Sequence, residues 1–66
     1  MKLIVNGESK ELPDNLTIKQ LIDYLGIKAP NYAVAVGMEV IPKSEYESYR
    51  LKDGDKVEIV TFVGGG

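Results

Sequence analysis

Three consecutive glycines, Gly64, Gly65 and Gly66, end the sequence and are its most distinctive chemical feature. Glycine adds no side-chain packing and loses the most conformational entropy when it is ordered, so a purely structural terminus gains nothing from three of them. A glycine tail is thin enough to enter a narrow channel, and it leaves the terminal carboxylate unshielded. We therefore expect residues 64–66 to form a flexible tail whose carboxylate is handled by an enzyme; a frayed chain end is the alternative.

The remaining residues offer little catalytic chemistry. The sequence contains no cysteine and no histidine, so it lacks a thiolate nucleophile and the commonest general base and metal ligand. A catalytic site would have to be built from Glu45, Tyr46, Glu47 and Tyr49, which fit better a solvated helical turn with tyrosine rings packed on the core. We expect the chain not to be an enzyme and to bind no metal or cofactor of its own.

Length and charge restrict the function further. With 66 residues the chain has room for one domain, spanning residues 1–66. The net charge is −2, and the basic residues are scattered, which argues against a nucleic-acid partner. No apolar run approaches membrane-spanning length, so we expect no membrane association and a cytoplasmic location.

The first elements expected are two strands joined by a tight turn. Residues 2–5 are apolar and largely β-branched, as in a strand. Asn6 and Gly7 follow, and this pair favours a type I′ hairpin turn, which needs positive φ at both positions. Residues 8–12 predict a more polar second strand that ends at Pro13, because proline has no backbone donor.

One helix is expected next. Thr17 and Gln20 have the spacing of a capping box, in which each side chain bonds the other residue's backbone N–H. An apolar stripe at helical spacing follows, formed by Ile18, Leu21, Ile22 and Leu25. Gly26 stands where a left-handed residue commonly ends a helix, with Ile27 as its apolar contact.

The second half of the chain predicts further strands and turns. Residues 33–36 and 39–41 indicate two strands around a turn at Gly37 and Met38, residues 44–49 a short helical turn, and residues 56–63 the last strand. Asp53 and Asp55 indicate a tight turn rather than a metal site. One helix can cover one face of one sheet, so this order favours an α+β fold of the β-grasp, ubiquitin-like type. Its mixed sheet of four to five strands has the first and last strands parallel at the centre.

Side-chain alternation divides the central strands into two faces. Four residues are assigned to the face under the helix: Leu3, Val5, Val57 and Ile59. Ile4, Val60 and Phe62 then lie on the open face, where a large aromatic beside two β-branched residues favours a partner-binding patch. Ala33 and Ala35 are expected nearby and would keep this patch flat. Scattered surface apolar residues, or an inverted register, are the alternatives.

Three segments resemble the ThiS family of sulfur carriers for the thiazole ring of thiamine. They are residues 2–7, residues 34–42 and residues 51–66, and the resemblance extends over the whole chain. The middle segment usually carries an Asn-Gly turn, for which Gly37 and Met38 stand here. This difference alters a turn and leaves the glycine tail unchanged.

The resemblance implies a mechanism centred on Gly66. A ThiF-like adenylyltransferase would use ATP to adenylate the Gly66 carboxylate, and a persulfide sulfur donor would then displace AMP to leave a thiocarboxylate. A ThiG-like thiazole synthase would accept the sulfur. Gly64 and Gly65 would thread the active site of each partner, and the chain itself would supply no catalytic residue.

Two other functions are compatible with the sequence. A MoaD-like sulfur carrier for molybdopterin synthesis would share the fold, the tail and the chemistry. A ubiquitin-like interaction module that is never activated would share only the fold, and the bare glycine tail argues against it.

Overall fold

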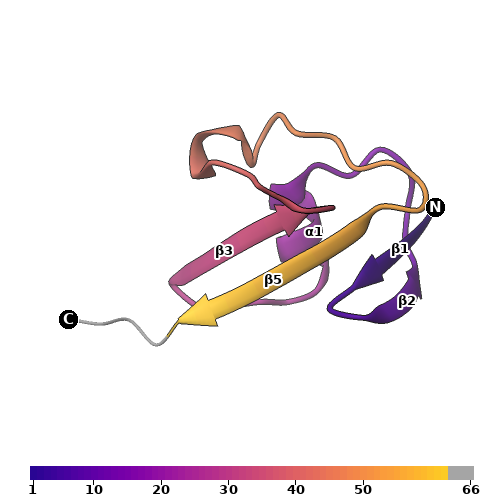
Figure 1. Ribbon diagram of the computed structural model, residues 1–66. Coiled ribbons are helices and arrows are strands. Elements are labelled where there is room, and N and C mark those ends of the chain that lie inside the picture. Colours follow the sequence, from indigo (N-terminus) through magenta and orange to yellow (C-terminus); the bar gives the residue numbers. More distant parts are fainter. Residues whose placement is uncertain (63–66) are drawn as a thin grey trace.

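The computed structural model describes residues 1–62, and these form a single sheet with one α-helix packed against it (Figure 1). The elements in chain order are β1 (Lys2–Val5), β2 (Glu8–Glu11), α1 (Ile18–Tyr24), β3 (Asn31–Val36), β4 (Glu39–Val40), the 3₁₀ helix η1 (Lys43–Glu45) and β5 (Lys56–Phe62). Neither helix is long and apolar enough to cross a membrane within this described part.

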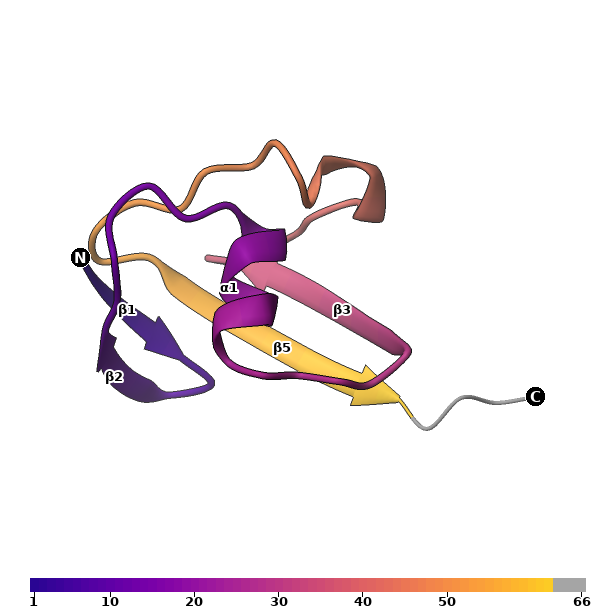
Figure 2. The same cartoon turned by 180° about the vertical axis from the view of Figure 1, so that it is seen from behind.

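The sheet has five strands in the order β2-β1-β5-β3-β4. Strands β1 and β5 are parallel neighbours at its centre, and the other neighbouring pairs are antiparallel. Helix α1 lies across one face, seen behind the sheet in Figure 1 and in front of it in Figure 2. This arrangement confirms the predicted β-grasp fold.

The turns and caps follow from the local sequence. Asn6 and Gly7 adopt positive φ values of 50° and 83°, as a type I′ turn requires. At the start of α1 the capping box is complete: the Gln20 N–H donates to Thr17 Oγ1 at 3.2 Å, and the Thr17 N–H donates to Gln20 Oε1 at 2.9 Å. At the other end Gly26 has a φ of 72°, which stops the helix.

Four element boundaries differ from the sequence-based expectation. Two differ by one residue: β2 ends at Glu11 rather than residue 12, and β4 ends at Val40 rather than residue 41. Strand β3 begins at Asn31 rather than residue 33, because Asn31 pairs with Phe62 across the long β5 strand. The helical turn expected at 44–49 is a 3₁₀ helix over Lys43–Glu45 followed by turns. Val63, the expected last residue of the final strand, lies outside the described residues.

The core lies between α1 and the sheet. Its buried apolar side chains are Leu3, Val5, Leu12, Ile18, Leu21, Ile22, Val34, Val36, Ile41, Tyr46, Leu51, Val57 and Ile59. The four strand residues assigned to the helix side are all among them, so the predicted register is confirmed. Burial of each such aliphatic side chain stabilises the fold by about 1.5–3 kcal/mol relative to its exposure. The chain has no cysteine and so no disulfide, and its stability therefore depends on this core.

Side chains complete the hydrogen-bond ladder where neighbouring strands stop short. After β1 ends, the Asn6 carboxamide pairs with the backbone of Ile59: Ile59 N–H donates to Asn6 Oδ1 at 2.8 Å, and Asn6 Nδ2 donates to the Ile59 carbonyl at 3.2 Å. On the other side of the sheet, the Val34 N–H donates to the buried Tyr46 hydroxyl at 3.1 Å. Both contacts satisfy backbone groups that would otherwise lose a partner.

The Asn6 contacts generate a prediction. Asn6→Gly preserves the positive φ of the turn but removes both side-chain hydrogen bonds to Ile59. We expect the free energy of unfolding to fall by about 1–3 kcal/mol, the sum of two net hydrogen bonds and the added freedom of glycine. Denaturant unfolding measures the free energy of unfolding. After correction for the change in global stability, amide hydrogen exchange should be faster at Ile59 and unchanged at Val34.

Asn6→Asp is the matched control for this prediction. Aspartate retains the acceptor for the Ile59 N–H but loses the donor to the Ile59 carbonyl. The Ile59 amide should therefore stay protected in this variant. Unchanged Ile59 exchange in Asn6→Gly would show that the carboxamide does not substitute for a strand.

Candidate functional site

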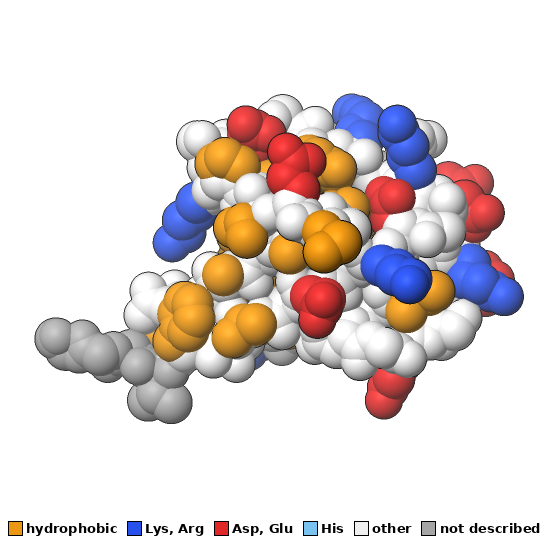
Figure 3. Space-filling view, viewed as in Figure 1, with side chains coloured by type: hydrophobic (Ala, Val, Ile, Leu, Met, Phe, Trp, Pro, Cys, Tyr) orange, Lys and Arg blue, Asp and Glu red, His pale blue; other side chains and the backbone are white. Residues whose placement is uncertain are grey.

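The candidate site begins with the apolar surface on the face of the sheet opposite α1. Val60 and Phe62 of β5 project there with 56% and 49% of their surface exposed, and Ile4 of β1 is half-buried on the same side. Figure 3 views this face, and apolar side chains gather on it over β5 and β3. The open-face placement predicted for these three residues is therefore confirmed, while their role in binding stays a prediction.

The cross-strand neighbours of this surface on β3 are small residues. Ala33 lies directly opposite Val60, and Ala35 lies opposite Glu58. Directly opposed residues of an antiparallel pair project from the same face, so both alanines lie on the open face. The two alanines therefore lie beside Val60 and Glu58 on the open face, which is the placement that the sequence predicted.

One member of this surface was missed from the sequence. Val40 of β4 is opposite Ala35 and is 72% exposed, so it extends the apolar surface toward the sheet edge. The alternation at positions 39–41 carried the signal, because Ile41 is buried and its neighbour must point the other way. We call the set Ile4, Ala33, Val40, Val60 and Phe62 the open-face patch.

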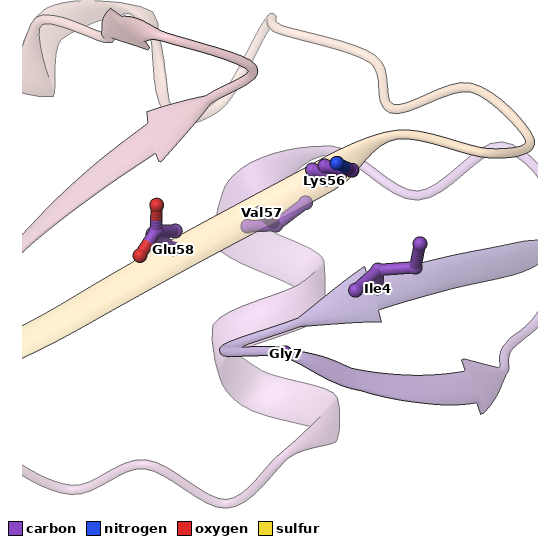
Figure 4. Close-up of a pocket in the computed structure, with 5 residues that line it drawn as sticks. All are labelled: Ile4, Gly7, Lys56, Val57 and Glu58. Carbon is purple, nitrogen blue, oxygen red and sulfur yellow. The ribbon is translucent and has the colours of Figure 1, made fainter.

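Charged side chains and a hollow border the patch on the β1 side. Lys56 lies opposite Ile4 in the parallel pair, and Glu58 follows along β5. Together with Gly7 and Val57 these residues line the hollow in Figure 4, where β1 turns away from β5. The surface therefore changes from apolar at Phe62 to mixed charge at Lys56.

The N-terminus is anchored at the far end of the sheet from Phe62 (Figure 1). The Met1 amine donates to the Leu12 carbonyl at 2.6 Å and to Asp14 Oδ1 at 2.8 Å. The hydrogen bond to Asp14 raises the pKa of the Met1 amine. These contacts position the start of β1 and lie away from the patch.

Of the residues considered for catalysis, Glu45 and Glu47 are exposed, and the two tyrosines have structural roles. Tyr46 is buried, its ring stacks on Tyr32 with centroids 5.6 Å apart, and its hydroxyl accepts the Val34 N–H. Tyr49 packs against the core. Within residues 1–62 no group of three or more acidic side chains is positioned to hold a metal ion.

Asp53 and Asp55 stabilise the turn before β5. Asp53 Oδ1 accepts the Lys2 N–H at 2.7 Å, and Asp55 Oδ2 accepts the Lys52 N–H at 2.9 Å. Both carboxylates therefore bond backbone donors, which confirms the turn interpretation.

The tail residues predicted to carry the chemistry, Gly64, Gly65 and Gly66, lie outside the described residues. The last described residue is Phe62 of the open-face patch, so the patch adjoins the tail in sequence. A protein that covers Phe62 is thereby close to the segment that follows it.

Comparison with known proteins assigns this arrangement to a family. The model of the ThiS family matches residues 3–66. The chain is 32% identical to the sulfur carrier protein ThiS of Thermus thermophilus, with 94% of this chain and 95% of that protein covered. It superposes on the crystal structure of the thiamine biosynthesis protein ThiS from Geobacter metallireducens with a TM-score of 0.86, 32% identity and full coverage of both chains.

A longer relative is also similar. The thiazole synthase of Paramagnetospirillum magneticum is 42% identical over all 66 residues of this chain, which spans 20% of that protein's length. The relative of matching length from Thermus thermophilus is a sulfur carrier protein, and the ThiS family model covers nearly the whole chain, so the prediction that this chain is not an enzyme is confirmed. Because the family match begins in β1 and continues to Gly66, the chain belongs to the ThiS family.

Proposed function

We propose that this chain is the sulfur carrier of a thiamine-forming pathway, with the sulfur held as a thiocarboxylate on Gly66. The observation that carries the proposal is the family match, which includes the glycine tail as well as the folded domain. The full-length similarity to a sulfur carrier of Thermus thermophilus supports it. We further propose a cytoplasmic setting, where ATP is available to the activating partner.

The proposed chemistry needs activation, because a carboxylate does not react with sulfur until one oxygen becomes part of a leaving group. A Gly66 oxygen attacks the α-phosphorus of ATP, and pyrophosphate leaves. A persulfide sulfur then attacks the acyl carbon and expels AMP. A second thiol attacks the disulfide so formed, which releases the Gly66 thiocarboxylate and leaves a disulfide between donor groups. A ThiF-like adenylyltransferase would catalyse the activation, and a ThiG-like thiazole synthase would take the sulfur.

The open-face patch is the proposed contact with these partners. Its large side chains, Val60 and Phe62, are exposed although the domain has few apolar residues to spare. Ile4 extends the contact to β1. The resemblance between this whole chain and a segment of a thiazole synthase supports a synthase as one partner.

Phe62→Asp tests the patch. The side chain is half exposed, so the substitution should leave the domain folded, and a carboxylate in a desolvated interface should weaken binding to a thiazole synthase by about tenfold or more. Isothermal titration calorimetry measures the affinity, and Lys10→Asp on β2, outside the patch, is the control. Wild-type affinity for Phe62→Asp would remove the patch from the interface.

The same titration with a molybdopterin synthase large subunit separates the thiamine pathway from the molybdopterin pathway.

Addition of one alanine after Gly66 tests the tail. The carboxylate moves by about 3.5 Å, whereas a misplacement near 1 Å can lower a rate about 100-fold. The folded domain and the patch are unchanged, so thermal stability and docking should persist while sulfur loading falls at least about 100-fold. A single-turnover loading assay with the activating enzyme, ATP and a persulfide donor measures the rate.

A chain with one alanine added before Met1 is the comparison, because it has the same composition and an intact tail. This extension should affect loading much less, although it disturbs the anchored amine. Loading of the C-terminally extended chain at the wild-type rate would contradict the assignment of the terminal carboxylate.

A further inference from the structure

Strand β5 continues well beyond its neighbour β1. The β1–β5 ladder contains two residue pairs, Ile4 with Lys56 and Val5 with Val57, whereas β3 accompanies β5 as far as Phe62. Figures 1 and 2 show β5 and β3 extending past the β1–β2 hairpin. The last part of β5 therefore has a strand on one side only.

The direction of each backbone group on β5 follows from two contacts. The Gly37 N–H donates to the Lys56 carbonyl at 2.8 Å, so the polar groups of even-numbered β5 residues point toward β3. Val34 bonds away from β5, since its N–H donates to Tyr46 and its carbonyl accepts the Ile41 N–H at 2.9 Å. Ile59 lies opposite Val34, so the backbone N–H and carbonyl groups of Ile59 and of the other odd-numbered β5 residues point toward the β1 side.

These odd-numbered residues have partners only as far as Ile59. The Val57 carbonyl accepts the Asn6 N–H at 2.9 Å, and both polar groups of Ile59 bond the Asn6 carboxamide. Thr61 is the next residue on this edge. Its N–H and carbonyl have no hydrogen-bond partner among residues 1–62.

This edge lacks the features that keep other sheet edges from pairing. The outer edge strand β2 carries charged side chains at most positions, and β4 has only two residues. Short strands and charged side chains prevent edge-to-edge association. At Thr61 no strand of the described residues covers the β1 side of β5. Thr61 is uncharged, and its neighbours Val60 and Phe62 in the open-face patch are apolar.

We propose that the Thr61 edge receives an extended segment of the thiazole-synthase partner, added as a strand beside β5 in line with β1. An unpaired donor and acceptor on one strand edge are matched by extended backbone, which is the basis of β-strand addition. The choice of partner rests on the proposed function. The edge is continuous with the patch, so one protein covers Thr61 while it contacts Val60 and Phe62.

The ends of the site are defined by the same residues. The Asn6 carboxamide already bonds the N–H and the carbonyl of Ile59, so the added strand cannot pair with β5 beyond Thr61 in the direction of β1. The hollow lined by Ile4, Gly7 and Glu58 lies at this end and provides room for a side chain of the added strand (Figure 4). In the other direction the described strand ends at Phe62, and Gly66 follows four residues later in the sequence.

Amide hydrogen exchange resolved by NMR tests the proposal on the full chain. In the dilute free protein the Thr61 amide should exchange much faster than those of its β3-bonded neighbours Val60 and Phe62. A thiazole synthase without a carrier segment of its own is then added at saturation. We expect Thr61 exchange to slow about tenfold or more, because its N–H becomes hydrogen-bonded.

Thr61→Pro provides a second measurement. Proline removes the Thr61 N–H, which does not bond β3, and its ring occupies the open edge. Affinity for the synthase should fall about tenfold, whereas Thr61→Val, which retains the N–H, should bind like the wild type. Comparison is made at matched thermal midpoints, and a chain synthesised with an ester in place of the Thr61 amide replaces Thr61→Pro if that variant does not fold.

Other outcomes overturn the proposal in distinguishable ways. Thr61 protection that appears in the free chain and rises with its concentration would assign the edge to a second copy. Synthase-induced shifts across the patch without Thr61 protection would contradict strand addition and leave the proposed function intact. Absence of any chemical-shift change on addition of the synthase would contradict the proposed function. It would also exclude the synthase as the protein that pairs with the Thr61 edge.

Discussion

The parallel pairing of β1 with β5 is the constraint on which the rest of the structure depends. It joins the two ends of the chain at the centre of the sheet, and it lasts for only two residue pairs because Asn6 and Gly7 turn the chain back. Where β1 accompanies β5, the sheet is continuous and supports the core. Beyond that point β5 has β3 alone, and this is the part that carries Val60, Phe62 and the proposed strand edge.

One strand therefore serves two purposes along its length. Val57 and Ile59 lie under α1, while Val60 and Phe62 lie on the opposite face and are half exposed. A chain of 66 residues buries a smaller fraction of its surface than a long one, so each apolar side chain left on the surface reduces the apolar area that can stabilise the core. The proposed carrier function gives these exposed residues a role, since a partner must hold the domain while it handles Gly66.

The sequence was sufficient to predict most of the fold because its turns and caps are strongly marked. The Asn6-Gly7 turn, the Thr17 capping box and the Gly26 stop each depend on residues within a few positions of one another. The two-residue alternation then assigned Ile4, Val60 and Phe62 to the open face correctly. The early start of β3 at Asn31 was missed because it depends on pairing with distant Phe62.

The contacts that escaped prediction are those between side chains and distant backbone. The Asn6 carboxamide on Ile59 and the Tyr46 hydroxyl on Val34 join residues that no local pattern connects. Val40 could have been assigned to the patch from its buried neighbour Ile41, but the β4 strand is too short for a clear alternation. The open Thr61 edge depends on the relative lengths of β1 and β5, which only the register reveals.

In the proposed function the chain carries sulfur on its last residue, Gly66. Intact-mass analysis after incubation with the activating enzyme, ATP and a persulfide donor tests it most directly, with fragmentation to locate the change. We expect replacement of one oxygen by one sulfur, confined to the fragment that ends at Gly66. Sulfur on an internal side chain, or an unchanged mass with an enzyme that loads another ThiS protein, would contradict it.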